Sequence, residues 1–201
     1  MRLPPISEPT QDQASLHARI TDRRGGVPGP FAVLLHSPHA GDKLEELATT
    51  CMRDSQLVPR LRELTLLIVA RRLDAQHSWN AHIDKAVAAG VDREALDRLA
   101  RGEQPRFPRP DEDVLHQFVT QILVEHFTDD ETYAAALAEL GESCLVELVI
   151  ALGTFATLAM LLNVFEVDLP PGSEPPFPDV RDFQRVLRPD HADSPKTAPT
   201  L

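Results

Sequence analysis

Cysteine is scarce in this sequence: only Cys51 and Cys144 occur among 201 residues. So low a count excludes a disulfide-rich scaffold. No C-x-x-C pair is present, which excludes a local zinc ribbon, a haem-attachment motif and a thioredoxin-type dithiol. We expect the two residues to be buried free thiols, with a Cys51–Cys144 bridge as the alternative.

Basic residues are also in short supply. The chain carries 20 Lys and Arg against 31 Asp and Glu, a formal net charge of −11. Nucleic acids and anionic membrane surfaces are bound through clustered Lys and Arg, so we expect neither as a partner. The N-terminal sequence MRLPPISEPT lacks the apolar segment of a signal peptide, which predicts a cytoplasmic protein.

One apolar segment needs a separate explanation, because residues 148–164 contain no charged side chain. A membrane-spanning helix needs about 20 predominantly apolar residues, and this run is shorter and contains Thr154, Thr157 and Asn163. A helix that is apolar all round is otherwise buried in a core or an interface. We therefore predict a core helix whose faces are covered with the help of a second subunit, which makes the protein a homo-oligomer.

Proline is absent from three long stretches, residues 39–58, 60–104 and 111–169. Proline disrupts helix interiors, so its absence favours helices in these stretches. Apolar residues recur within them at helical spacing, and no long alternation of apolar and polar residues indicates a strand. The sequence predicts an all-α fold with about seven or eight helices.

Several helix boundaries are predicted by capping residues. Pro59 suits the first turn of a helix that runs to about Leu73, and Asp92 suits an N-cap. Thr128 and Glu131 match the T-x-x-E capping box. Helix ends are predicted at three glycines, Gly90, Gly102 and Gly141.

The domain organisation follows from where the prolines gather. We assign residues 1–171 to one helical domain and residues 172–201 to a Pro-rich C-terminal extension that is partly disordered. Residues 180–187, VRDFQRVL, are expected to form a short amphipathic segment that docks on the domain. The last dozen residues are expected to be disordered.

The candidate chemistry lies in two helices at residues 60–90, with a predicted break near Asp74. Glu63 opens the buried run LTLLIVA, and a carboxylate at the edge of such a run must find a partner. Arg60 and Arg71 lie on roughly the same helical face as Glu63. We expect one of them to pair with Glu63, or to hold a substrate carboxylate or enolate.

The second of these helices carries Ser78 and His82 at i, i+4 spacing, on a face of small residues that lets another helix approach closely. His82 is therefore expected to point into a packed seam. Imidazole is the side chain best suited to proton transfer near neutral pH. His77 and His82 project about 140° apart on a helix, which is poor convergence, so no metal site is predicted.

The spacing Glu63, Ala75, Ser78, His82 resembles a known motif. Redox members of the carboxymuconolactone decarboxylase and alkyl hydroperoxidase D superfamily carry E-x11-C-x2-C-x3-H. Ala75 and Ser78 stand where those members have their two cysteines. A thiol peroxidase cycle needs a low-pKa thiolate and a resolving thiol, so an alkyl hydroperoxidase-like reductase is disfavoured.

The decarboxylase-like members of that superfamily often read R-x2-E at the start of the motif and Y-E-W-x2-H at its end. Arg60 and Glu63 match the first pattern, and Trp79 and His82 match the second, while Ser78 replaces the Glu. Three further segments also resemble family members: RLPP at residues 2–5, GPFAVLLHSP at 29–38 and MLLNVFEVDLP at 160–170.

The resemblance implies an all-α bundle in which the two motif helices pack near a subunit interface, assembled as a trimer or hexamer. It implies Glu63 and His82 as catalytic residues. We add five residues as candidates for substrate binding: Arg60, Arg71, Ser78, Trp79 and His36. The expected function is a cofactor-free lyase or isomerase that acts on a small organic acid, lactone or polyketide-like intermediate by Glu/His proton transfer.

A structural role is the alternative for each residue. Glu63 with an arginine would then be a buried ion pair, His82 a core histidine and Ser78 a packing residue. The corresponding whole-protein alternative is a non-catalytic oligomeric binding homologue. The remaining histidines of interest are interpreted as surface or cap residues: His36, which also stands among the binding candidates, His39, His116 and His126.

Overall fold

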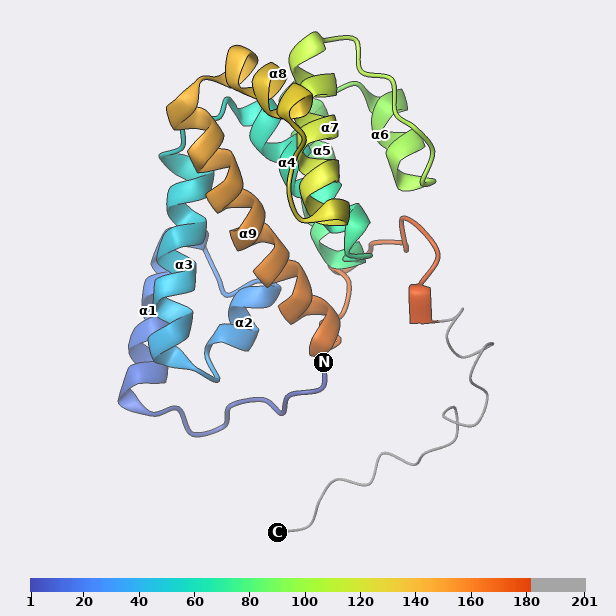
Figure 1. Ribbon diagram of the computed structural model, residues 1–201. Helices are drawn as coiled ribbons and strands as arrows, with labels where there is room; N and C mark the ends of the chain where they lie inside the picture. The colour runs from blue at the N-terminus through green and yellow to red at the C-terminus, as the bar shows by residue number, and fades with distance from the viewer. Residues whose placement is uncertain (182–201) are drawn as a thin grey trace.

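The computed structural model describes residues 1–181, which form nine helices and no strand (Figure 1). The all-α prediction is confirmed, with one helix more than expected. The helices are α1 (Gln11–Arg24), α2 (Pro30–Leu34), α3 (Pro38–Arg53), α4 (Pro59–Arg72), α5 (Gln76–Ala88), α6 (Arg93–Ala100), α7 (Pro110–Glu125), α8 (Asp130–Leu140) and α9 (Glu142–Val164).

Helix α4 lies at the centre of the main core. Every residue from Glu63 to Ala70 is buried, because α5, α7 and α9 pack around it. The unbroken apolar run in its sequence requires this, since an exposed face would leave large aliphatic side chains in water. α4 is thus the element against which the candidate site is assembled.

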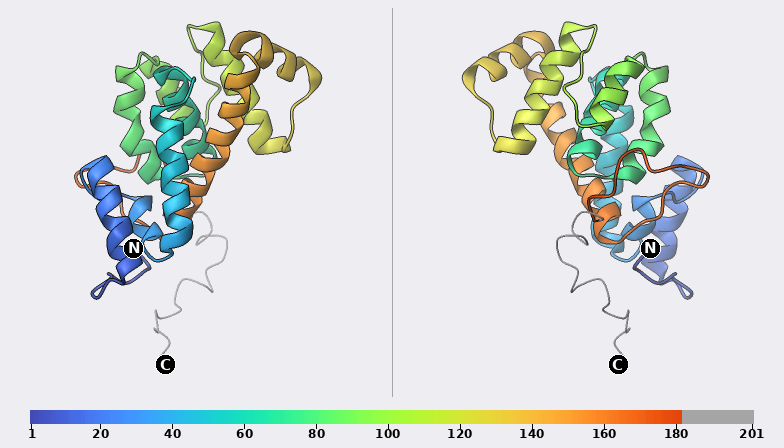
Figure 2. Two further views of the ribbon diagram at one scale, coloured as in Figure 1. Left: turned by 90° about the vertical axis from the view of Figure 1, so that its left-hand side faces the viewer. Right: turned by 90° about the vertical axis from the view of Figure 1, so that its right-hand side faces the viewer.

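The N-terminal helices form a second, smaller core. Leu16 and Ile20 of α1 pack with Phe31 and Leu34 of α2 and with Ala48 of α3. The C-terminal half of α9 closes this cluster through Leu158 and Leu161. Figure 2 shows α1 and α2 at one end of the molecule and α7 and α8 at the other, with α9 running between them.

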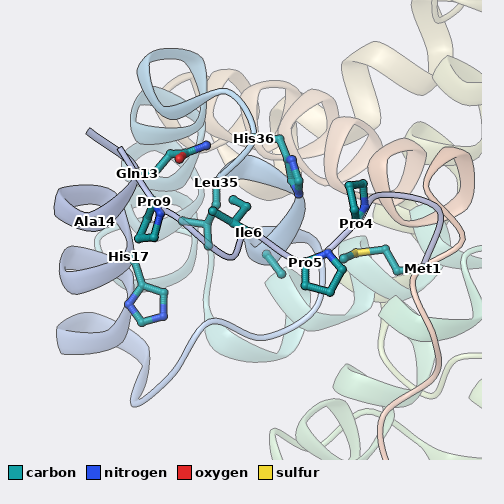
Figure 3. A pocket seen from close by; sticks show the side chains of 11 residues that line it. Met1, Pro4, Pro5, Ile6, Pro9, Gln13, Ala14, His17, Leu35 and His36 are labelled. Carbon is teal, nitrogen blue, oxygen red and sulfur yellow. The ribbon is translucent and has the colours of Figure 1, made fainter. Parts of the chain in front are cut away.

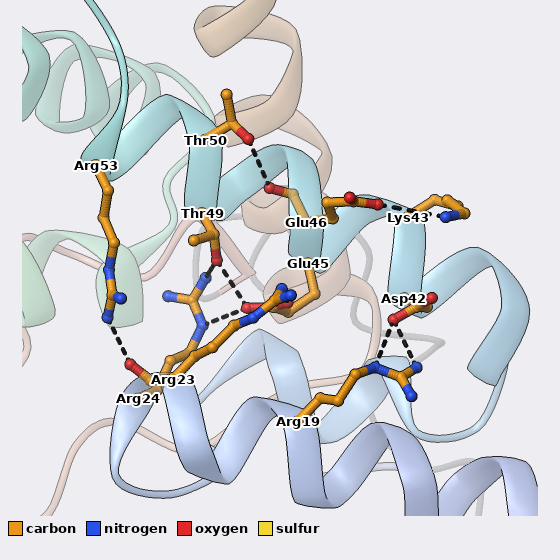
Figure 4. Close-up of polar contacts among 10 residues, drawn as sticks. All are labelled: Arg19, Arg23, Arg24, Asp42, Lys43, Glu45, Glu46, Thr49, Thr50 and Arg53. Carbon is orange, nitrogen blue, oxygen red and sulfur yellow. Dashed lines mark hydrogen bonds and ion pairs between the residues drawn. The ribbon is translucent and has the colours of Figure 1, made fainter.

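A buried carboxylate joins α1 to α3. Glu45 of α3 is fully buried and accepts hydrogen bonds from Arg23 at 2.5 Å and Arg24 at 3.1 Å, both on α1 (Figure 4). Thr49, one turn later on α3, donates to the same carboxylate at 2.8 Å. The two helices are therefore fixed by a satisfied charge cluster as well as by apolar packing.

The predicted helix boundaries are mostly correct. α4 begins at Pro59, and the Asp92 side chain accepts from the Ala95 N–H at 2.9 Å as an N-cap. The capping box at Thr128 is wrong, because α8 starts one residue later than that box requires. Asp129 is the N-cap and accepts from the Thr132 N–H at 2.7 Å.

Helix α9 has 23 residues and is long and apolar enough to cross a membrane, and half of its most apolar window is buried inside the protein. Its other side presents large apolar side chains to the outside at helical spacing. These are Val146, Val149, Ile150, Met160 and Val164, which we call the α9 stripe. The sequence predicted a helix covered on all faces, and one chain leaves this stripe uncovered.

The predicted C-terminal extension begins in the described region and ends outside it. The expected disorder of the last dozen residues and most of the segment 180–187 lie outside the described residues. Within the described part, Phe177 is buried and belongs to the main core. The first residues of the extension are therefore part of the packed structure.

Candidate functional site

The sharp break between α4 and α5 brings Glu63 and His82 together. Asp74 adopts a left-handed conformation with φ of 52°, so the chain turns within three residues and α5 packs back on α4. His82 Nδ1 lies 2.7 Å from Glu63 Oε2. The Glu63 side chain is 8% exposed and that of His82 is 19% exposed, so the pair lies at the edge of the core.

This contact orients the imidazole. The Glu63 carboxylate accepts from His82 Nδ1–H, which leaves Nε2 as the basic nitrogen of the neutral ring. Among the described residues, none forms a hydrogen bond with His82 Nε2. A carboxylate that holds an imidazole in one tautomer, with the second nitrogen free, is an arrangement suited to general acid–base chemistry. We call this pair the Glu63–His82 dyad.

Arg60 does not join the dyad, although the sequence placed it on the same helical face. Its guanidinium donates to Glu112 at 2.6 Å and forms a bidentate pair with Asp111, both at the start of α7. The hydrogen bond to Asp111 raises the pKa of Arg60 against the effect of burial. The expected pairing of Glu63 with an arginine is wrong, because α7 supplies carboxylates that no local pattern reveals.

Arg71 is occupied in the same way. Its Nη1 donates to Asp74 at 2.8 Å and its Nε donates to the Ala100 carbonyl at 2.8 Å. The guanidinium carbon also lies 4.8 Å from the centre of the Phe177 ring, which is a cation–π contact. Arg71 therefore stabilises the break after α4 and links it to α6.

Trp79 and Ser78 lie on α5 near His82, but only Ser78 is partly accessible. Trp79 is 3% exposed and meets Phe177 edge to face, with ring centres 5.7 Å apart. Gln76 donates to the Phe177 carbonyl at 2.6 Å, which holds the extension on α5. Phe177 was not predicted from the sequence. The one feature that could have indicated it is an aromatic residue among the prolines of an extension that we expected to bury little apolar surface.

His36 lies in a different place from the dyad. It follows α2 and lines a cavity of about 450 Å³ beneath the N-terminal segment (Figure 3). Two further cavities, of about 1130 and 610 Å³, lie at the end of α9 and along α7. None of these three cavities of the described chain has Glu63 or His82 in its lining.

His77 of α5 connects two distant segments of the chain, at Asp168 and at Gly29. Its Nδ1 lies 2.6 Å from the Asp168 carbonyl oxygen, and its ring packs on Gly29, where a Cβ atom would approach Nε2 to 2.6 Å. Gly29 has φ of 53°, so both its conformation and this close approach require glycine. Burial lowers the pKa of His77, and the charge of His82 lowers it further.

His116 departs from the expected surface or cap role. It is 6% exposed on α7, and burial together with Arg72 lowers its pKa to about 4. His126 does serve as the C-cap of α7. Within residues 1–181, no group of three or more His, Cys, Asp or Glu side chains is placed to hold a metal ion.

The cysteines are free, as expected, with Cys51 buried and Cys144 partly buried. Burial raises the pKa of both thiols. Neither therefore has the environment of a reactive thiolate.

Comparison with known proteins gives no family. No protein-family model matches the sequence, and no curated protein matches it. The argument for function therefore rests on the residues of this chain and their geometry.

Proposed function

We propose that the protein is a cofactor-free lyase or isomerase of the carboxymuconolactone decarboxylase-like family. Its substrate would be a small organic acid, lactone or polyketide-like intermediate. The observation that carries the proposal is the 2.7 Å contact between Glu63 and His82, two residues whose spacing matches the family motif. The proposed catalytic group is His82 Nε2, and Glu63 is its positioning residue.

The chemistry requires one proton and one place for developing negative charge. In decarboxylation of a β-keto acid, the C–C bond to the carboxylate breaks, CO2 leaves, and the electron pair forms an enolate. The protonated His82 then delivers its Nε2 proton to the enolate carbon and takes another from solvent. In an isomerisation the same nitrogen removes a proton from one carbon and returns it to another, so no proton is consumed overall.

The enolate oxygen needs a hydrogen-bond donor or cation, and the two expected arginines are already engaged. Arg60 is bound to Asp111 and Glu112, and Arg71 to Asp74. Our proposal therefore includes a homo-oligomer, a trimer or hexamer, in which a second subunit covers the dyad and completes the substrate pocket. Ser78, one turn before His82 and partly accessible, is the candidate from the same chain for a substrate contact.

The test incubates the full chain with a panel of β-keto acids and γ-lactones. Turnover of the acids is measured as CO2 release, and turnover of the lactones as loss of the lactone carbonyl signal. Glu63→Gln and His82→Gln are each expected to reduce turnover by about 100-fold or more. The matched control is His39→Gln, because this side chain is 93% exposed and lies on α3. Turnover that persists in both dyad variants contradicts the assigned roles.

One observation favours a second candidate, a non-catalytic oligomeric binding homologue. None of the three cavities given above is lined by the dyad, which fits an interhelix contact that stabilises α4 against α5. In that case no substrate of the panel is turned over, and His82→Gln lowers the melting temperature instead. An alkyl hydroperoxidase-like reductase is the least favoured candidate, because burial raises the pKa of both thiols.

A further inference from the structure

A separate cavity lies beneath the N-terminal segment. Residues 3–9, which we call the strap, pass over α1 and the end of α2 and border a half-open cavity of about 450 Å³ (Figure 3). Small-molecule sites typically enclose about 300–1,000 Å³. Neither Glu63 nor His82 lines this cavity, so it is distinct from the proposed active site.

The strap is held at its ends and free in between. At one end the Arg2 N–H donates to the Phe165 carbonyl at 2.7 Å, and its guanidinium donates to Glu166 at 2.9 Å. At the other end, Thr10 and Gln13 form the capping box of α1. Residues 3–9 form no hydrogen bond with any other described residue.

Proline keeps the strap from collapsing onto α1. Pro4, Pro5 and Pro9 all line the cavity, and their fixed φ favours an extended chain. Proline rings are apolar and carry no N–H donor, so these three residues present mainly apolar surface to the cavity. Ile6 of the strap and Leu35 at the end of α2 also line the cavity (Figure 3).

The polar groups of the lining are hydrogen-bond donors or imidazoles, and none is a carboxylate. His17 on α1 and His36 after α2 lie at opposite ends of the cavity (Figure 3). Gln13 uses its Oε1 to accept from the Thr10 N–H, which leaves its Nε2 donor free. An anionic group placed in this cavity therefore meets no like charge from the side chains of the lining, and it can accept a hydrogen bond from Gln13 or from an imidazole.

The geometry points to a binding site for a small, mostly apolar carboxylic acid in this cavity. The apolar body of the ligand packs between the strap and Leu35, and its carboxylate is held by His17 together with the free Nε2 of Gln13, one turn earlier on α1. Because the strap is tethered only at its ends, a ligand enters by displacing residues 3–9 without breaking any hydrogen bond of the described structure.

The experiment titrates the full chain, labelled with 13C-histidine, with 2-naphthoate as the probe. We expect saturable shifts of the His17 and His36 ring signals, with His82 and His116 unmoved, and a calorimetric stoichiometry of one probe per chain. Ala14→Phe fills the cavity from α1 and is expected to weaken binding about tenfold or more. Ala18→Phe is the matched control, since Ala18 is exposed on the same helix outside the lining.

A second variant separates the charge contact from simple apolar packing. His17→Ala, at an exposed position of the lining, is expected to weaken 2-naphthoate about tenfold while leaving neutral 2-naphthamide nearly unchanged. The proposal is overturned by absence of saturable binding up to about 1 mM. It is equally overturned by ring shifts at other histidines, or by equal affinity in the Ala14→Phe and Ala18→Phe proteins.

Discussion

Single buried charges in this protein are paired across helices. Glu45 of α3 receives two arginines of α1, Glu63 of α4 contacts His82 of α5, and Glu112 of α7 receives Arg60 of α4. Removing Arg60 would leave the buried Glu112 carboxylate without its cation, at a cost of about 3–5 kcal/mol, whereas Glu45 keeps a second arginine when one is removed. Each pair therefore specifies which helices meet, whatever its net contribution to stability.

His116 makes stability depend on pH. Its pKa is about 4 in the folded protein, against about 6.5 in an unfolded chain. Between these values the unfolded state binds a proton that the folded state does not, so stability falls as the pH drops from about 6.5 to about 4. The loss is about 3 kcal/mol and ceases below the folded pKa, where both states are protonated.

The measurement is urea unfolding of wild type and His116→Gln between pH 4 and pH 7. The difference in unfolding free energy between the two proteins should change across this window and be constant above it. His39→Gln, which changes an imidazole that is 93% exposed on α3, should follow the wild-type curve. A pH-independent difference between wild type and His116→Gln would refute the titration of His116.

Among the helices, α8 shows which of two adjacent residues, Thr128 or Asp129, serves as the N-cap. Asp129 accepts from Thr132 and also from the Gln121 amide at 2.8 Å, whereas Thr128 precedes the helix without capping it. Asp129→Ala should cost about 1 kcal/mol of unfolding free energy, measured by chemical denaturation. Thr128→Ala is the control and should cost nearly nothing; the reverse order would restore the capping box predicted from sequence.

The docked start of the C-terminal extension is a second element whose role can be measured. Phe177 covers Trp79, which is the only tryptophan of the chain. Phe177→Ala should therefore expose the indole, shift its emission to longer wavelength and increase quenching by iodide. Phe127→Ala, which removes a phenylalanine that is 72% exposed, should leave the emission unchanged. Identical spectra for wild type and Phe177→Ala would show that the contact is not kept in solution.

At the scale of the whole molecule, the α9 stripe is the feature that one chain does not explain. An exposed row of Val, Ile and Met along a helix is typical of a protein–protein interface. The proposed trimer or hexamer covers this row with another subunit. Light scattering should then give three or six times the chain mass of 22.3 kDa at micromolar concentration.

Val149→Lys places a charge in the middle of the α9 stripe and should shift the protein to the monomer, because a charge is costly to bury without a partner. Val124→Lys changes an exposed valine of α7 and should leave the assembly intact. A wild-type protein that is monomeric at this concentration contradicts the proposed oligomer. Dissociation by both variants would place the interface elsewhere.

Local patterns were enough for much of the secondary structure, whereas Glu63 and His82 were singled out by their family-like spacing and the local pattern paired Glu63 with an arginine. Pro59, Asp92 and the break at Asp74 mark boundaries that depend on the backbone within a few residues. Glu63 and His82 lie on two consecutive helices joined by a short turn. The helical period therefore decides which faces they occupy, and the turn leaves little choice in how the helices pack.

The pattern of residues along the chain predicts that it is helical, where most helices start and end, and that Glu63 and His82 lie on adjoining helices. Which distant residues these helices contact depends on tertiary packing. Arg60 of α4 pairs with carboxylates of α7, His36 lies apart from the dyad, His116 is buried and Phe177 packs on Trp79. Capping and periodicity act within about one or two helical turns, whereas pairing and burial depend on which helices pack together, so no local pattern reveals them.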